Sequence, residues 1–198
     1  MQVISRYRET YERVSLPLGK LCTGLGITPN ALTLMSVVIA GLAGWAIAVG
    51  HFVLGAVLIL LAGVFDTLDG ATARAAGLAS NFGTVLDHVA DRYAEFVIFV
   101  GIYLSGEVRF FWAFVALFGM LMASYTRAKA ESKGKVESCT VGIAERQEKL
   151  GLVMLGLVLE AIVPGRNLLE LSVIIVAIIS HITVVQRLAY AKRHSPKE

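Results

Sequence analysis

Six long apolar runs follow one another along the chain, and each is bounded by glycine, proline or charged residues. A bilayer core of roughly 30 Å requires about 20 residues of helix, so each run is long enough to cross a membrane. Stretches such as LSVIIVAIISHITVV are apolar all round, whereas a helix of a soluble bundle carries its apolar residues along one stripe. The pattern predicts an all-α integral membrane protein with six transmembrane helices, over about residues 31–50, 52–76, 81–104, 110–130, 143–163 and 168–191.

A further helix is predicted ahead of the first apolar run. Its charged residues are interleaved with apolar residues at helical spacing, namely Val3, Ile4, Tyr7, Tyr11, Val14 and Leu18. An amphipathic helix of this kind lies in the headgroup layer with its apolar face towards the acyl chains. We therefore expect an N-terminal amphipathic interfacial helix over residues 1–22 and a six-helix bundle over about residues 30–192. Together they would form a single membrane domain over residues 1–198.

The distribution of charge predicts the orientation. A net charge of +3 is too small to indicate a nucleic-acid partner, and of the 18 Lys and Arg residues only Arg109 and Arg166 map to the side opposite the termini. Because basic residues are retained on the cytoplasmic side, both termini are expected in the cytoplasm, in a multi-pass protein of a prokaryotic cell membrane. The stretch ESKGKVESCTVG at 131–142 is expected to be a flexible cytoplasmic loop. Cys22 and Cys139 match no metal-ligand spacing and are predicted to be free thiols.

Four aspartates interrupt the apolar pattern. Asp66 and Asp69 lie three residues apart near the end of the second predicted span, and Asp87 and Asp91 lie four apart near the start of the third. Each pair therefore shares one face of its helix, and a short turn at residues 77–81 makes the two helices antiparallel neighbours. Since one charged side chain deep in a bilayer costs roughly 2.5 to 3.5 kcal/mol, four converging carboxylates require neutralisation. An all-oxygen set suits Mg²⁺ or Mn²⁺, and four carboxylates can hold two such ions.

Residues that suit a phosphate ligand surround these acids. Gly70, Ala73 and Gly83 leave the helix backbones accessible, and Arg74 offers a cationic fork to a phosphate. Two divalent ions neutralise both a pyrophosphate and the oxygen that leaves it. The expected chemistry is therefore the transfer of a phosphate group.

The order D-x2-D-G-x2-A-R-x8-G-x3-D-x3-D, from Asp66 to Asp91, resembles the signature of the CDP-alcohol phosphotransferase family at every fixed position. The resemblance implies a six-helix membrane enzyme, usually a homodimer, that transfers the phosphatidyl-type group of a CDP-linked lipid to an alcohol and releases CMP. It also implies that Asp66, Asp69, Asp87 and Asp91 bind metal, that Asp91 is the general base, and that the CDP-lipid is bound by Asp69, Gly70, Ala73, Arg74, Gly83 and Asp87. Whether Asp91 is base, metal ligand or both stays open.

Basic residues beyond the signature bear on the identity of the alcohol. The positive-inside rule accounts for part of this group, but the guanidinium forks of Arg127 and Arg146 favour an acceptor that already carries phosphate. We expect the acceptor phosphate to be bound by Arg127, Lys135, Arg146, Lys149 and Arg187. The segments ITPNALTL, SYTRAKAE and GIAERQEKL resemble the branch of the family that makes phosphatidylinositol phosphate or archaetidylinositol phosphate from inositol phosphate.

Two alternatives stay open. Glycerol 3-phosphate is a second phosphorylated acceptor, which would give phosphatidylglycerol phosphate, whereas serine would leave the arginines without a phosphate to bind. A small cation transporter is an alternative of a different class, because intramembrane acids also mark ion pathways. The four aspartates gather near one membrane surface, however, and the exceptions Glu160 and His181 have no acidic or metal-ligand partner in the sequence. We expect packing roles for both.

Overall fold

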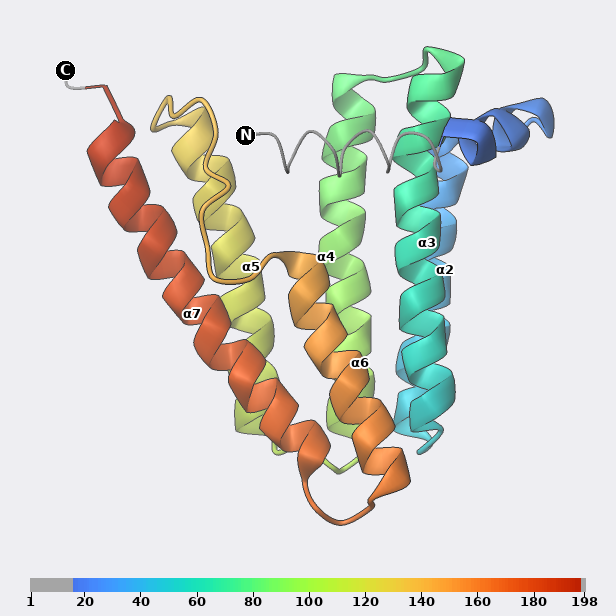
Figure 1. Cartoon of the computed structure of the whole chain (residues 1–198), viewed down its shortest axis with the longest axis vertical. Helices are drawn as coiled ribbons and strands as arrows, with labels where there is room; N and C mark the ends of the chain where they lie inside the picture. The colour runs from blue at the N-terminus through green and yellow to red at the C-terminus, as the bar shows by residue number, and fades with distance from the viewer. Residues whose placement is uncertain (1–15, 197–198) are drawn as a thin grey trace. The chain divides into compact units, whose positions relative to one another are not determined.

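The computed structural model describes residues 16–196, and every regular element in this range is a helix. Helices lie over all six predicted segments (Figure 1): α2 (Pro29–Ala48), α3 (Phe52–Ala76), α4 (Asn81–Leu104), α5 (Phe110–Ser132), α6 (Arg146–Ile162) and α7 (Leu168–His194). The predicted bounds of the second and third segments agree with α3 and α4. Helix α6 begins three residues later than the fifth predicted segment. The all-helical prediction is confirmed.

Four helices of the described part are long and apolar enough to cross a membrane, namely α2, α3, α5 and α7. Helix α6 has 17 residues, fewer than the about 20 that span a bilayer. Helix α4 is long enough, but any stretch of 18 residues within it contains all four of its charged residues, Asp87, Asp91, Arg92 and Glu95. Each such stretch therefore carries more charge than the apolar stretches of α2, α3, α5 and α7. The prediction of a helical, multi-pass membrane protein is therefore confirmed, while the number of six spans stays a prediction.

The chain divides into two compact units, Met1–Ala43 with Val57–Val97 and Gly44–Ala56 with Ile98–Glu198. The first unit holds most of α2, α3 and α4. The second unit holds the rest of these helices together with all of α5, α6 and α7. The four aspartates of the signature belong to the first unit, and the five expected acceptor residues belong to the second.

In the first unit, a tight turn joins α3 to α4 and makes them antiparallel neighbours, as predicted (Figure 1). Gly77 ends α3 in the left-handed conformation (φ 66°), and the N–H of Leu78 donates to the carbonyl of Ala73 at 2.9 Å. This is a glycine-based helix cap. Ser80 then caps α4, because its Oγ accepts the N–H of Gly83 at 3.0 Å. The cap that ends α3 and the cap that begins α4 lie within four residues of each other. The aspartates of both helices therefore lie near the same end of this helix pair.

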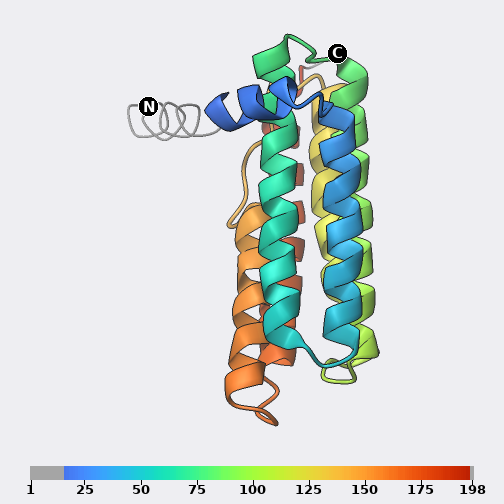
Figure 2. The ribbon, with the colours of Figure 1, turned by 90° about the vertical axis from the view of Figure 1, so that its right-hand side faces the viewer.

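A short helical segment at residues 16–24 lies across α3 (Figure 2). Gly19 makes this crossing possible, because a Cβ at this position would lie 2.6 Å from the carbonyl oxygen of Ala71. Only a residue without a side chain allows the two backbones to approach so closely. Residues 1–15 of the predicted N-terminal amphipathic helix lie outside the described residues.

In the second unit, α7 packs against both α5 and α6 through small residues. A Cβ on Gly119 of α5 would lie 2.9 Å from the Cβ of Ser180, and one on Gly156 of α6 would lie 2.1 Å from Oγ of Ser172. Small residues at such contacts let helix backbones approach, which is how membrane helices gain packing energy without a hydrophobic driving force.

Glu160 and His181 both have partners in the protein backbone. The carboxylate of Glu160 accepts the N–H groups of Gly165, Leu168 and Leu169 at 2.9, 2.6 and 3.2 Å, so it caps the start of α7. Nε2 of His181 lies 3.2 Å from the carbonyl oxygen of Val115 on α5. These contacts support the structural roles expected for the two residues.

The connection between α5 and α6 is tied to α5 and α7 within the second unit. Cys139 and Val136 are buried. The N–H of Cys139 donates to Oε1 of Glu131 at 3.0 Å, and Nε of Arg187 donates to the carbonyl of Val141 at 3.0 Å. The stretch after Ser132 is a loop, as predicted, and its flexibility stays a prediction; the contacts with α5 and α7 were not predicted, because they do not follow from composition.

Candidate active site

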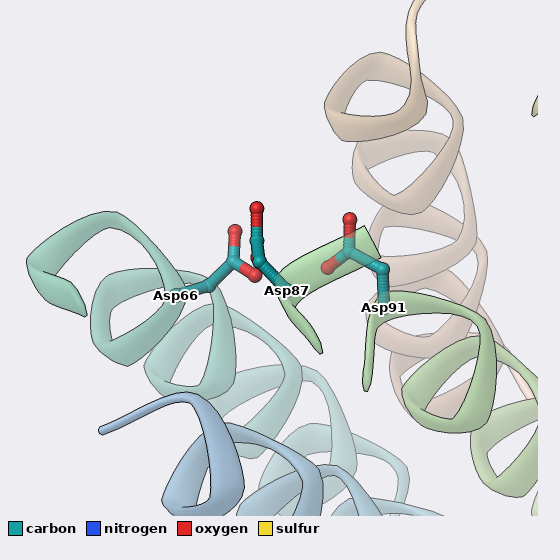
Figure 3. Close-up of side chains that lie close together, drawn as sticks. All are labelled: Asp66, Asp87 and Asp91. Carbon is teal, nitrogen blue, oxygen red and sulfur yellow. The ribbon is translucent and has the colours of Figure 1, made fainter. Parts of the chain in front are cut away.

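Three carboxylates converge within the first unit. Asp66 comes from α3, and Asp87 and Asp91 come from α4 (Figure 3). One oxygen atom from each lies within 4.8 Å of the others, and all three residues are half-buried. The i, i+4 spacing on α4 and the tight turn after α3 thus bring these acids together, as the sequence predicts.

Asp69 has different surroundings. It follows Asp66 by three residues on α3, yet it is not part of the three-carboxylate group found among the described residues. Its carboxylate instead accepts a hydrogen bond from the hydroxyl of Thr33 on α2. Asp69 is 6% exposed and Thr33 is 4% exposed. The sequence prediction did not identify Thr33, although a threonine within an apolar helix is a signal that a polar partner is near.

The small residues of the signature lie beside Arg74 in the same unit. A Cβ on Gly70 would lie 3.3 Å from Nη1 of Arg74, so the exposed guanidinium folds back over Gly70 on its own helix. A Cβ on Gly83 would lie 3.9 Å from Oδ1 of Asn30, which places the beginnings of α2 and α4 close together. Ala73, which lies on α3 with Gly70 and Arg74, is half-buried. The arrangement offers an exposed cation beside backbone that carries little side chain, which suits a phosphate ligand.

An ion pair adjoins Asp91. Nη2 of Arg92 lies 2.9 Å from Oε1 of Glu95 and 3.4 Å from Oδ2 of Asp91. Glu95 is fully buried, and a buried carboxylate is tolerated when a cation lies beside it. Arg92 and Glu95 were not among the predicted site residues, although their i, i+3 spacing on a membrane helix is a recognisable signal for an ion pair.

The donor set of the acidic group fits the predicted divalent metal. It consists of carboxylate oxygens, which Mg²⁺ and Mn²⁺ prefer, and contains no histidine or cysteine. Carboxylates this close to one another repel, so a bound cation stabilises their charged forms. The residues present can therefore hold such an ion.

The two predicted acceptor arginines at the ends of α5 and α7 differ in exposure. Arg127 is exposed, and its Nε donates to Oε1 of Glu131 at 3.0 Å. Arg187 is buried, and its Nε and Nη1 donate to the carbonyls of Val141 and Ala123 at 3.0 and 2.7 Å. Arg187 therefore also ties the α5–α6 connection to two helices.

The other three predicted acceptor residues lie along the same stretch of the second unit. Arg146 is half-buried as the first residue of α6, and Lys149 is buried one turn later. Lys135 is exposed in the connection and has a left-handed backbone (φ 53°). The five residues thus differ widely in accessibility, which the sequence pattern did not indicate.

Residues 26–188 match the family model described as CDP-alcohol phosphatidyltransferase, and the chain belongs to this family. It is 35% identical over 191 residues to the archaetidylinositol phosphate synthase of Pyrococcus horikoshii, covering 96% of this chain and 97% of that one. It is 31% identical to the phosphatidylinositol phosphate synthase of Mycobacteroides abscessus, covering 96% and 88% of the two chains.

The fold resembles that of the phosphatidylinositol phosphate synthase of Mycobacterium tuberculosis. The crystal structure of that enzyme with CDP-DAG bound has a TM-score of 0.81 and 28% identity, and covers 90% of this chain and 94% of that one. A second crystal structure of the same enzyme, in complex with manganese and citrate, also has a TM-score of 0.81. Family membership confirms the prediction of an enzyme and decides against the transporter alternative.

Proposed function

We propose that this enzyme transfers the phosphatidyl-type group of a CDP-linked lipid to inositol phosphate and releases CMP. The convergence of the carboxylates of Asp66, Asp87 and Asp91, within the family signature, is the observation that carries the proposal. The names of the relatives support inositol phosphate as the acceptor. They include both an archaetidyl and a phosphatidyl enzyme, so CDP-archaeol and CDP-diacylglycerol are both candidate lipid substrates.

The four aspartates of the signature are the proposed metal-binding residues, for two ions: Asp66, Asp69, Asp87 and Asp91. When bound, Mg²⁺ or Mn²⁺ supplies positive charge to the pyrophosphate of the CDP-lipid and to the oxygen that leaves with CMP. The manganese complex of the Mycobacterium tuberculosis enzyme supports this choice of metal.

Asp91 is the proposed general base. Its carboxylate accepts the proton of the acceptor hydroxyl, and the resulting oxygen attacks the phosphorus on the lipid side of the pyrophosphate. The bond from this phosphorus to the oxygen of CMP breaks, and CMP leaves. The contact of Oδ2 with Arg92 at 3.4 Å supports a fixed orientation of this carboxylate.

The nucleotide half of the lipid substrate is proposed to lie along α3 and the first turns of α4. Its ligands are Asp69, Gly70, Ala73, Arg74, Gly83 and Asp87. The exposed guanidinium of Arg74 beside Gly70 supports a phosphate contact here, because an arginine fork binds phosphate oxygens with two parallel hydrogen bonds.

The phosphate of the acceptor is proposed to be bound by residues of the second unit, namely Arg127, Lys135, Arg146, Lys149 and Arg187. The exposed guanidinium of Arg127 is the most accessible arginine of this group. Arg187 contributes the donors that do not bind Val141 and Ala123.

We also propose the cellular arrangement that the sequence predicts. All six helices span the membrane, α4 with its charged residues towards the site, and both termini and the active site face the cytoplasm of a prokaryotic cell. The family match over residues 26–188 supports one catalytic domain over residues 1–198. A homodimer follows from the resemblance to the family.

A panel of substrates tests the proposal. Purified enzyme with Mn²⁺ receives CDP-diacylglycerol or CDP-archaeol together with inositol phosphate, glycerol 3-phosphate, serine or no acceptor, and released CMP is quantified. Release is expected with inositol phosphate. Faster release with glycerol 3-phosphate would reassign the acceptor, and no release with any acceptor would overturn the proposed transfer.

A further inference from the structure

We infer that Thr33 is a positioning residue for Asp69, so that α2 contributes to a site otherwise built by α3 and α4. The inference deepens the proposed function and rests on it where Asp69 is a ligand. Thr33 and Asp69 are 36 residues apart, and the hydroxyl of Thr33 donates to Oδ2 of Asp69. Both residues belong to the first unit.

The carboxylate is the preferred acceptor of this hydroxyl. Oγ1 of Thr33 also lies 3.2 Å from the carbonyl oxygen of Pro29, within its own helix, but its contact with Asp69 is the shorter one. A hydroxyl has a single hydrogen to donate, and a hydrogen bond to a charged acceptor is stronger than one to a neutral carbonyl. The hydrogen is therefore directed across the helices rather than along α2.

Burial makes this bond matter. Thr33 is 4% exposed and Asp69 is 6% exposed, so water has little access to replace a lost donor. A buried acceptor that loses its donor bears the desolvation penalty of that group. The orientation of the Asp69 carboxylate thus depends on a hydroxyl from another helix.

The consequence is a division among the four aspartates. Spacing alone puts Asp69 on the same face of α3 as Asp66, yet the three-carboxylate group consists of Asp66, Asp87 and Asp91. Thr33 occupies one of the acceptor sites of the Asp69 carboxylate, at Oδ2, and leaves the others for a ligand. The hydroxyl therefore helps to set the direction in which the carboxylate of Asp69 points.

Substitution of Thr33 separates the hydroxyl from the shape of the side chain. Thr33→Val keeps the shape and removes the donor, whereas Thr33→Ser keeps the donor. Thr72→Val is the matched control, because Thr72 is fully buried on α3 and its hydroxyl donates at 2.7 Å to the carbonyl of Leu68 in the same helix. Size-exclusion chromatography and thermal unfolding establish that each variant is folded, and Thr33→Ala replaces Thr33→Val if the latter is not.

The main readout is Mn²⁺ binding to the purified enzyme without substrates, followed by electron paramagnetic resonance. Loss of one hydrogen bond to a charged group corresponds to about tenfold weaker binding in Thr33→Val. Thr33→Ser and Thr72→Val are expected to bind Mn²⁺ as the wild type does. In the CMP assay, Thr33→Val should raise KM for the CDP-lipid and leave KM for inositol phosphate unchanged.

The outcomes separate this inference from the proposed function. Wild-type affinity for Mn²⁺ in folded Thr33→Val overturns it, as does equal weakening in Thr33→Ser or in Thr72→Val. A wild-type enzyme that releases no CMP with any acceptor contradicts the proposed function, while the Mn²⁺ titration still tests the role of Thr33.

Discussion

The acidic residues of the first unit and the basic residues of the second unit are both charges in an apolar helical protein, but their surroundings differ. Asp66, Asp87 and Asp91 gather like charges within 4.8 Å, an arrangement that a cation from outside stabilises. Arg127 and Arg187 instead donate to acceptors of the protein itself, a glutamate and two backbone carbonyls. The acidic group is thus a concentration of like charge that suits a bound cation, whereas the basic group also holds the structure together.

Removal of divalent metal should have the largest effect of all. The enzyme is treated with a chelator, its metal content is verified by mass spectrometry, and CMP release is measured. Activity is expected to vanish, because the carboxylates alone cannot neutralise a pyrophosphate, and to return with Mn²⁺ or Mg²⁺. Unchanged turnover by metal-free enzyme would show that the acidic group is not organised for a metal.

Asp91→Asn should have the next largest effect. General-base catalysis contributes roughly 10² to 10⁴ in rate, so kcat should fall by at least about 100-fold while binding of the CDP-lipid is largely retained. His88→Ala is the control, since His88 is exposed on the same helix. Full activity of Asp91→Asn would remove the assignment of the base.

Arg187→Ala tests the structural half of the comparison. It removes two hydrogen bonds from a buried cation, at about 1.5 kcal/mol or more each, so the Tm should fall by several degrees. The exposed Arg193 lies on the same helix, and Arg193→Ala should leave the Tm unchanged. If both variants unfold at the wild-type Tm, Arg187 does not hold the α5–α6 connection in place.

Arg127→Ala tests the ligand-binding half. Loss of a charge-assisted contact should raise KM for inositol phosphate by about tenfold, with the Tm nearly unchanged because Arg127 is exposed. Lys129, exposed and near the ring of Tyr125, supplies the control variant Lys129→Ala. If KM for the CDP-lipid rose instead, Arg127 would be assigned to binding of the CDP-lipid.

Labelling of the two cysteines should show the smallest effect. The two thiols should differ in their rate of modification, and the enzyme should keep its activity. Burial raises the pKa of the Cys139 thiol, so less of it is thiolate at neutral pH, and its fully buried sulfur is shielded from reagents. Cys22 is half-buried. Iodoacetamide should modify Cys22 first at pH 7, and the rate at Cys139 should rise as the pH is raised. Equal rates at pH 7 would mean that the α5–α6 connection opens readily.

The sequence was sufficient to predict the helices of the described range and the convergence of three of the four aspartates. Apolar runs bounded by glycine, proline and charge predicted α3 and α4 with their observed bounds, and the turn signals around Gly77 and Ser80 predicted their antiparallel arrangement. The contacts of the connection after α5 were not predicted, because its polar composition is that of an ordinary loop. Burial of Cys139 depends on partners in α5 and α7 that no local pattern reveals.

The sequence by itself determined the membrane class through the length of its apolar runs, and the family through the signature from Asp66 to Asp91. It also determined the convergence of Asp66, Asp87 and Asp91, because helical spacing and a short turn are properties of residues close in the chain. Only the tertiary structure decided the surroundings of Asp69 and Arg187. Their partners lie 36 residues away for Asp69 and 46 and 64 residues away for Arg187. Contacts at such separations depend on how helices pack, and helix packing is not encoded in the periodicity of any single helix.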